Sequence, residues 1–329
     1  MIKKTFYLFF IISLFLIIIF SGCAGGPVSA QEYYSIGMAY FELGKYEEAE
    51  KWLSRARLSD RTLVASTYNL GRLAFERERY EEAAKYFESI LKKDPDNVLA
   101  LKAAAYSRIK TTEIEIAEKH YYRLLDIVPE SADDGYNHAL VLYTLERYSA
   151  AEEVLLKYPV ALQENKDTML LFARCQAALK KLEAIDRFAD WLSVNSDAKV
   201  RYEYAQTLEY HELYARALEE YRLAHTGIAD TSVNPKKSDV RFAIAKVLLT
   251  ADGENAEGAA ELEKAVLEGF DNIPSVEGLL AIKGVSTSNK NSIQNTINAM
   301  RMSAAEKEKQ EQERLAAETV SESVENEQN

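Results

Sequence analysis

The sequence contains few of the residue types that build catalytic and metal sites. Only two cysteines and four histidines occur in 329 residues, and the histidines are not spaced like the ligands of a metal ion. A glycine-rich phosphate loop, a nucleophile elbow and a His-Glu-x-x-His pair are all absent. Paired acids such as Glu47-Glu48 and Glu81-Glu82 recur along the chain, whereas a catalytic pair would occur once. We therefore predict that the protein is not an enzyme and holds no metal or other cofactor.

Basic charge is also scarce. The chain carries 40 basic against 52 acidic residues, a formal net charge of −12. Nucleic acids and anionic membrane surfaces attract basic proteins, so this acidic chain is poorly suited to either by charge alone. We expect no nucleic-acid partner.

Long apolar runs are absent except at the N-terminus. Lys3 and Lys4 precede an apolar stretch over 6–20, in which Tyr7 and Ser13 carry the only hydroxyls. A basic start followed by a short apolar stretch and small residues is typical of a secretory signal. A membrane-spanning helix usually needs about 20 apolar residues, so this stretch is short for a permanent span.

The residues that follow the apolar stretch resemble a bacterial lipobox. Positions 20–23 read Phe-Ser-Gly-Cys, with small residues before the cysteine. The resemblance implies a lipoprotein signal peptide over 1–22, acylation of Cys23, and a lipidated tether over 23–29. Ala24 stands where an aspartate would retain such a protein at the inner membrane. We therefore expect a periplasm-facing membrane lipoprotein, with the outer membrane favoured; an ordinary secreted protein and an uncleaved anchor are the alternatives.

What the chain does contain is a period of 34 residues. Four alanines follow this step, and tyrosines and glycines keep fixed offsets from them. The members are Ala49, Ala83, Ala117 and Ala151, with Tyr46, Tyr80 and Tyr148, and Gly37 and Gly71. A self-similar period of this length indicates a stack of two-helix units, each of which buries its apolar face on its neighbours. No β-type alternation interrupts the helical pattern, so the predicted fold is all-α.

The second unit resembles a tetratricopeptide repeat. It carries Leu70-Gly71, then Tyr80 and Ala83, then Phe87 and Pro95 at the offsets of that family. The resemblance implies a tetratricopeptide-type α-solenoid over 30–285, a right-handed superhelix of about seven helix-turn-helix repeats. The remaining segment, 286–329, is polar and rich in glutamate, and we predict an acidic, largely disordered tail.

Each repeated residue type has a physical reason. Gly37 and Gly71 let the two helices of a unit approach closely, and the alanines do the same from the second helix. Large apolar residues at Phe87, Tyr121 and Leu155 are expected between neighbouring units. We expect two unusual residues to be packed in the core. Cys175 is interpreted as a small buried side chain, and His138 as an inward-facing histidine rather than a pH switch.

The resemblance also indicates where a partner would bind. In tetratricopeptide superhelices the concave groove is lined by the first helix of each unit, and here those positions form an aromatic stripe with scattered cations. Tyrosine and arginine dominate binding hot spots. The predicted partner-binding residues are Tyr34, Met38, Phe41, Tyr68, Asn69, Arg72, Phe75, Lys102, Tyr106, Tyr136, Asn137, Tyr143, Arg174 and Tyr202.

The resulting functional hypothesis is a membrane-anchored scaffold. It would bind an extended segment or a helix of another envelope protein in its groove during envelope assembly. Acylated Cys23 would anchor it in the lipid bilayer. The alternative is an accessory lipoprotein of a transporter, which would hold a small apolar ligand in a pore of the repeat stack.

Overall fold

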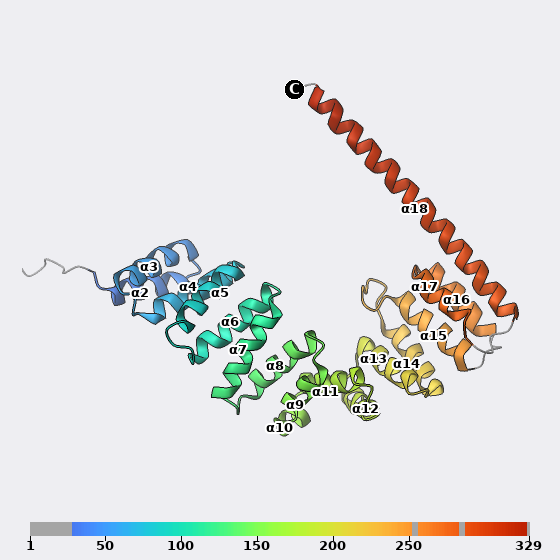
Figure 1. Ribbon diagram of the computed structural model, residues 1–329, viewed down its shortest axis with the longest axis horizontal. Coiled ribbons are helices and arrows are strands. Elements are labelled where there is room, and N and C mark those ends of the chain that lie inside the picture. The colour runs from blue at the N-terminus through green and yellow to red at the C-terminus, as the bar shows by residue number, and fades with distance from the viewer. Residues whose placement is uncertain (1–27, 252–255, 283–286, 328–329) are drawn as a thin grey trace, which may run out of the picture. The chain divides into compact units, whose positions relative to one another are not determined.

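The computed structural model describes residues 28–251, 256–282 and 287–327, with side chains as far as Leu315. Across these ranges the chain forms seventeen helices and no strand (Figure 1), which confirms the all-α prediction. The predicted signal peptide, Cys23 and most of the predicted tether lie outside the described residues.

The helices divide between two compact units, the first ending at Arg147 and the second beginning at Tyr148. Unit 1 contains α2 (Ala30–Glu42), α3 (Tyr46–Ser59), α4 (Val64–Glu76), α5 (Tyr80–Leu91), α6 (Val98–Lys110), α7 (Ile114–Ile127) and α8 (Ala132–Thr144). Unit 2 contains α9 (Tyr148–Leu155), α10 (Pro159–Glu164), α11 (Lys166–Ala178), α12 (Ala184–Val194), α13 (Ala198–Tyr210), α14 (Tyr214–Gly227), α15 (Lys237–Ala251), α16 (Ala256–Leu267), α17 (Ile273–Leu279) and α18 (Thr287–Glu327). By register unit 1 contains the repeats α2/α3, α4/α5 and α6/α7, and unit 2 contains α11/α12, α13/α14 and α15/α16. In the sequence the fourth repeat begins with α8 in unit 1 and continues with α9 in unit 2.

The starts of the first helices follow the 34-residue period. Asn97, Ser131 and Asn165 occupy equivalent positions and cap α6, α8 and α11. In each case a side-chain oxygen accepts a hydrogen bond from a backbone N–H of the first turn, which satisfies one of the donors that a helix start leaves free. The polar residue before each first helix therefore fixes where the repeat begins.

The turn inside each repeat is equally regular. The residue two positions after the first helix has a positive φ at Gly44, Glu78, Thr112, Glu146, Lys180 and Glu212, between 57° and 69°. Only glycine adopts this left-handed conformation without a steric cost. Five of these six repeats therefore make the turn with a residue that is strained there.

Within a repeat the two helices pack at the predicted small residues. A Cβ atom at Gly37 would lie 2.8 Å from Leu53 Cγ, and one at Gly71 would lie 2.7 Å from the Phe87 ring. The four alanines of the ladder are fully buried. Phe87, Tyr121 and Leu155 are 2%, 1% and 0% exposed. Phe87 and Tyr121 share core clusters with Ala104 and Val141 of the following repeats, as predicted for large residues between units.

An ion pair joins successive repeats at a second regular interval. A glutamate on the second helix meets a cation 29 residues later, at the turn of the next repeat. The pairs are Glu50–Arg79 at 3.0 Å, Glu118–Arg147 at 3.9 Å and Glu152–Lys181 at 2.6 Å. Between the second and third repeats this ion pair is missing, because Ala84 stands in place of the acid and Glu113 in place of the cation. The loss of one partner is thus accompanied by the loss of the other.

The C-terminal end of the stack differs from the sequence prediction. The first turns of α18, assigned there to the acidic tail, bury Ile293, Ile297 and Met300 in the core that Leu262 and Phe270 form. These three residues lie on one helical stripe, so they cover the apolar face that α16 and the Phe270 turn present. From Ser303 to Leu315 the side chains of α18 are exposed, and the disorder expected for the tail stays a prediction.

Candidate partner-binding face

Four predicted residues gather between α2 and α4 in unit 1, and we call them the N-terminal cluster: Tyr34, Phe41, Asn69 and Arg72. Asn69 is buried, and its Nδ2 donates to Tyr34 Oη at 3.1 Å and to the Ala65 carbonyl at 3.0 Å. Its Oδ1 accepts a bond from Arg72 Nη1 at 3.0 Å. The Arg72 guanidinium lies 5.0 Å from the centre of the Phe41 ring, within the range of a cation–π contact. Asn69 therefore orients the arginine, whose side chain is exposed.

A second group lies between α4, α5 and α6, and we call it the aromatic shelf: Phe75, Tyr80, Tyr106 and Lys110. The rings of Phe75 and Tyr106 are stacked with centroids 5.3 Å apart, and Tyr80 meets the edge of Phe75 at 5.0 Å. Lys110 Nζ lies 5.6 Å from the centre of the Tyr106 ring. Tyr106 is nevertheless 48% exposed. A large aromatic surface is thus held in place by its neighbours and left open to solvent.

Lys102 has a structural partner that the sequence prediction did not assign to it. Its Nζ lies 2.9 Å from Asp134 Oδ1, and Asp134 is 2% exposed. The other carboxylate oxygen accepts a 2.6 Å hydrogen bond from the Ser131 hydroxyl. The ammonium group of Lys102 is therefore committed to neutralising a buried carboxylate at the start of α8.

The remaining predicted residues of unit 1 are mostly enclosed. Tyr68 packs against Phe87 with ring centroids 5.3 Å apart, so it belongs in part to the core. The other predicted residues of unit 1 are half-buried, namely Met38, Tyr136, Asn137 and Tyr143.

The two predicted residues of unit 2 are engaged with neighbouring helices. Arg174 donates to both carboxylate oxygens of Glu203, from Nε at 2.7 Å and from Nη2 at 2.9 Å. Tyr202 packs on Tyr221 at 5.6 Å, and burial raises its pKa to about 12. Taken with unit 1, the exposed members of the stripe are Arg72, Lys102 and Tyr106.

Two contributors to this face are missing from the predicted stripe. Lys110 and Asp134 both lie on first helices, one turn from residues that were predicted. Lys110 could have been found from the sequence, because it directly follows Ile109, which occupies the repeat position of Phe75. Asp134 had no such signal, because its partner Lys102 is 32 residues away rather than at the 34-residue step.

Comparison with known proteins fits this geometry. The family model described as "Tetratricopeptide repeat" matches residues 65–97, which hold the α4/α5 pair. A crystal structure of a tetratricopeptide repeat protein from Parabacteroides merdae superposes with a TM-score of 0.52 at 20% identity, over 77% of this chain and 98% of that one. The chain has the fold of a tetratricopeptide repeat solenoid.

Other solved structures align with parts of this tetratricopeptide chain. YrrB, described as a TPR protein with an unusual peptide-binding site, has 20% identity and a TM-score of 0.49 over 54% of this chain and 93% of its own. Pseudomonas aeruginosa pilF has 20% identity and a TM-score of 0.46 over 71% of this chain and 97% of its own. Among curated proteins, no sequence matches.

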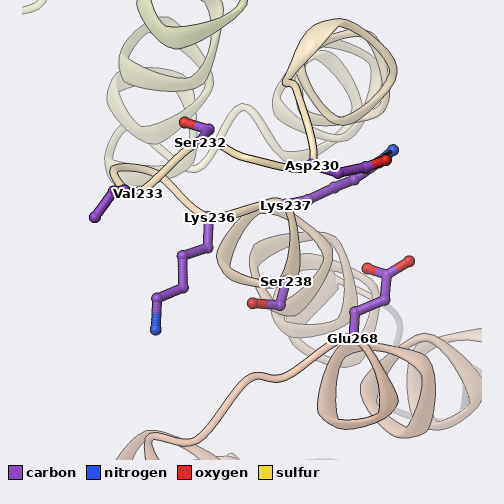
Figure 2. A pocket seen from close by; sticks show the side chains of 7 residues that line it. All are labelled: Asp230, Ser232, Val233, Lys236, Lys237, Ser238 and Glu268. Atoms are coloured by element: carbon purple, nitrogen blue, oxygen red, sulfur yellow. Dashed lines mark hydrogen bonds and ion pairs between the residues drawn. The ribbon is translucent and has the colours of Figure 1, made fainter.

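A hollow of about 430 Å³ lies in unit 2 of the tetratricopeptide stack, beside the start of α15 (Figure 2). Six of its seven lining residues are polar or charged. Lys237 Nζ lies 2.8 Å from Asp230 Oδ1, and Figure 2 shows these two side chains converging. The Lys236 amide donates to Asp239 Oδ2 at 2.8 Å. Lys237 and the backbone at the start of α15 therefore already have carboxylate partners.

Cys175 and His138 are both buried, as predicted. Cys175 is fully buried, and burial raises the pKa of its thiol to about 12. His138 is 4% exposed, its ring centroid lies 6.5 Å from those of Tyr121 and Tyr122, and its Nε2 lies 3.5 Å from Glu118 Oε1. Both residues therefore occupy packed positions.

In the ranges that the structure describes, no three histidine, cysteine or acidic side chains are grouped so as to hold a metal ion. Within the same ranges no helix is long and apolar enough to span a bilayer.

Proposed function

We propose that this protein is a non-catalytic scaffold of the cell envelope. It is held at a membrane by acylated Cys23, faces the periplasm, and binds an extended segment or a helix of a partner protein along the first-helix face of unit 1. The lipobox-like residues 20–23 support the anchor, and Ala24 favours the outer membrane. Repeat stacks of this kind present long continuous surfaces, which suits the binding of a polypeptide segment.

The observation that carries the proposal is the aromatic shelf. Tyr106 has nearly half of its surface in solvent, yet Phe75 beneath it and Lys110 beside it fix the ring. A preorganised tyrosine loses little conformational entropy on binding and offers both apolar area and a hydroxyl. Arg72, one repeat earlier at the equivalent position, is oriented in the same way by Asn69. Two oriented hot-spot residues at equivalent positions of adjacent repeats favour a partner that runs along the stack.

Site-specific photocrosslinking of the intact protein in its own membrane tests this proposal. A photoreactive phenylalanine analogue at position 106 should give a discrete adduct, and peptide mapping should place the crosslink in one segment of one partner. The same analogue at Lys85, an exposed residue of α5 on the second helix, is the matched control. We expect no discrete adduct from position 85.

A combined Arg72→Ala/Tyr106→Ala variant gives the second arm. Both side chains are exposed, so the variant should fold, whereas Tyr68→Ala would remove a ring from the core. Loss of the partner from the double variant, with membrane attachment unchanged, supports the face. Equal adducts from positions 106 and 85, or full partner recovery by the double variant, would contradict it.

The hollow in unit 2 does not support the alternative function, in which the protein carries a small apolar ligand. That hollow is lined by lysine, serine and carboxylate side chains with Val233 as its one apolar residue. A carrier of an apolar ligand needs a predominantly apolar pocket.

A further inference from the structure

The first helix of the stack exposes positions that later repeats bury. Ile36 on α2 is 36% exposed, while the residues at its position in the next two repeats, Leu70 and Ala104, are 1% and 0% exposed. Tyr40 is half-buried, while its equivalent Ala74 is fully buried. The same surface of the repeat is thus core in α4 and α6 and partly open to solvent in α2.

The reason is the absence of a preceding pair in the described part of the chain. In the second and third repeats, the second helix of the preceding repeat packs on these positions, α3 on α4 and α5 on α6. Within the described residues no helix precedes α2. A stack of repeats usually ends in a polar cap, because the open end would otherwise expose apolar surface.

This end is not polar. Tyr33, Ile36, Tyr40 and Leu43 follow one stripe of α2, and no charged residue interrupts it. Trp52 of α3 extends the surface, since its ring stacks on Tyr33 with centroids 5.8 Å apart. We call these five residues the N-terminal end face. Leu43 is 69% exposed, so the apolar surface reaches the far end of the helix.

One cation borders the end face. The Arg55 guanidinium lies 4.7 Å from the centre of the Trp52 ring, which holds it at the edge of the apolar surface. Tryptophan and tyrosine with a neighbouring arginine are the residue types that settle at the interface between lipid headgroups and hydrocarbon. Arginine also binds phosphate oxygens through two parallel N–H groups.

The proposed anchor places this face beside a bilayer. Six residues separate Cys23 from Ala30, the first residue of α2, and the seven residue-to-residue steps between them span at most about 25 Å. We propose that the N-terminal end face rests on the lipid surface, with Trp52, Tyr33 and Tyr40 in the headgroup region and Arg55 on a lipid phosphate. This inference rests on the proposed anchoring at Cys23, and it makes the end face a second, weaker membrane contact.

A bilayer suits this face better than a second copy of the chain. The tether holds every copy within reach of the headgroups, so the contact with lipid is intramolecular in effect and needs little affinity. The contact is also independent of anionic lipid, since the face is uncharged and the chain is acidic. It would orient the stack so that the second and third repeats project from the membrane.

The two tryptophans of the chain provide the test. Full-length acylated protein with Trp191→Phe keeps only Trp52, and it is reconstituted into phosphatidylcholine vesicles with or without lipids that carry a spin label near the headgroup. We expect strong quenching of Trp52 by the labelled lipid. The matched control, Trp52→Phe, keeps Trp191, which is 6% exposed in unit 2 and should be quenched little. Ile36→Asp in the Trp191→Phe background should abolish the quenching of Trp52 while the protein still floats with the vesicles.

A second readout covers the case in which Trp191→Phe does not fold. An environment-sensitive maleimide on Ile36→Cys should report an apolar surrounding in vesicles, and one on Val194→Cys, 79% exposed, should not. The remaining thiol, Cys175, is fully buried and should not react.

Each outcome decides between the proposals. A protein that floats with vesicles but whose Trp52 is quenched no more than Trp191 refutes the end-face contact alone. A Trp52 signal that changes with protein concentration instead of with labelled lipid identifies a second copy as the occupant and also refutes it. A protein that does not float refutes the anchor together with the contact, while crosslinking from position 106 reports on partner binding separately.

Discussion

Arg108 and Glu88 face each other between the third and second repeats, with Nε–Oε1 and Nη2–Oε2 distances of 2.7 Å each. Arg108 is 7% exposed and occupies a position that Ala74 and Leu142 fill in neighbouring repeats. It also donates to Glu81 at 2.8 Å and pairs with Glu113. Hydrogen bonding to Glu88, ahead of the opposing effect of burial, raises the pKa of Arg108 above its usual value. A charged network therefore replaces apolar packing at one joint of the stack.

Removal of this arginine should destabilise unit 1. Arg108→Ala leaves Glu88 and Glu113 close together without their cation, so we expect a loss of about 2–3 kcal/mol, less than for a fully buried pair because both carboxylates keep contact with water. Urea unfolding followed by circular dichroism measures the change. Arg72→Ala, which removes an exposed arginine, serves as the control and should cost well under half as much. Equal midpoints for the wild type and Arg108→Ala would contradict the assigned role.

Relief of strain at the turn of the third repeat should stabilise the protein. Thr112 has a φ of 60°, a conformation in which a β-branched side chain clashes with its own backbone. Thr112→Gly removes that clash, and we expect a gain of about 1 kcal/mol. The reverse change at the equivalent turn, Gly44→Thr, should cost a similar amount, since Gly44 has a φ of 69° and its missing Cβ meets no atom within 4 Å. Thermal unfolding should therefore shift in opposite directions for the two variants, and shifts of the same sign would exclude backbone strain as the cause.

His120 should make stability fall in mild acid. Burial is the largest influence on this histidine and lowers its pKa below 6.5, although Glu88, 3.7 Å away, opposes the shift. Because the unfolded chain binds the proton more readily than the folded one, the contribution of neutral His120 is present above about pH 6.5 and is lost as the pH falls below that value. The difference in unfolding free energy between wild type and His120→Gln should consequently shrink between pH 7.5 and pH 5.5. A constant difference over that range would show that His120 does not titrate on unfolding.

The features that repeat could be predicted from the sequence, and those that break the period could not. Gly71 against Phe87 follows from a 34-residue ladder, because each repeat reuses the same helix contact. Lys102 with Asp134 and Arg174 with Glu203 lie 32 and 29 residues apart, so their pairing depends on how neighbouring first helices are offset. Arg108 stands alone at an apolar position and gave no repeated signal. Ile293, Ile297 and Met300 form a stripe of single apolar residues in a polar segment, which composition does not distinguish from a solvated tail.

The pair Lys102–Asp134 should respond unequally to the loss of each partner. Lys102→Met leaves a carboxylate that is 2% exposed without its cation, so we expect a loss of about 1–2 kcal/mol. Asp134→Asn leaves an ammonium group that is half exposed and hydrated, and the new amide oxygen still accepts from Ser131. Its cost should be below about 1 kcal/mol, mostly from the lost attraction of the carboxylate to the start of α8. A double-mutant cycle by urea unfolding measures the coupling, and the double variant should be no less stable than Lys102→Met alone. The same variants separate structure from binding, since Asp134→Asn frees the Lys102 ammonium: crosslinking from position 106 should persist in Asp134→Asn, and its loss there would mean that the ion pair itself shapes the partner-binding face.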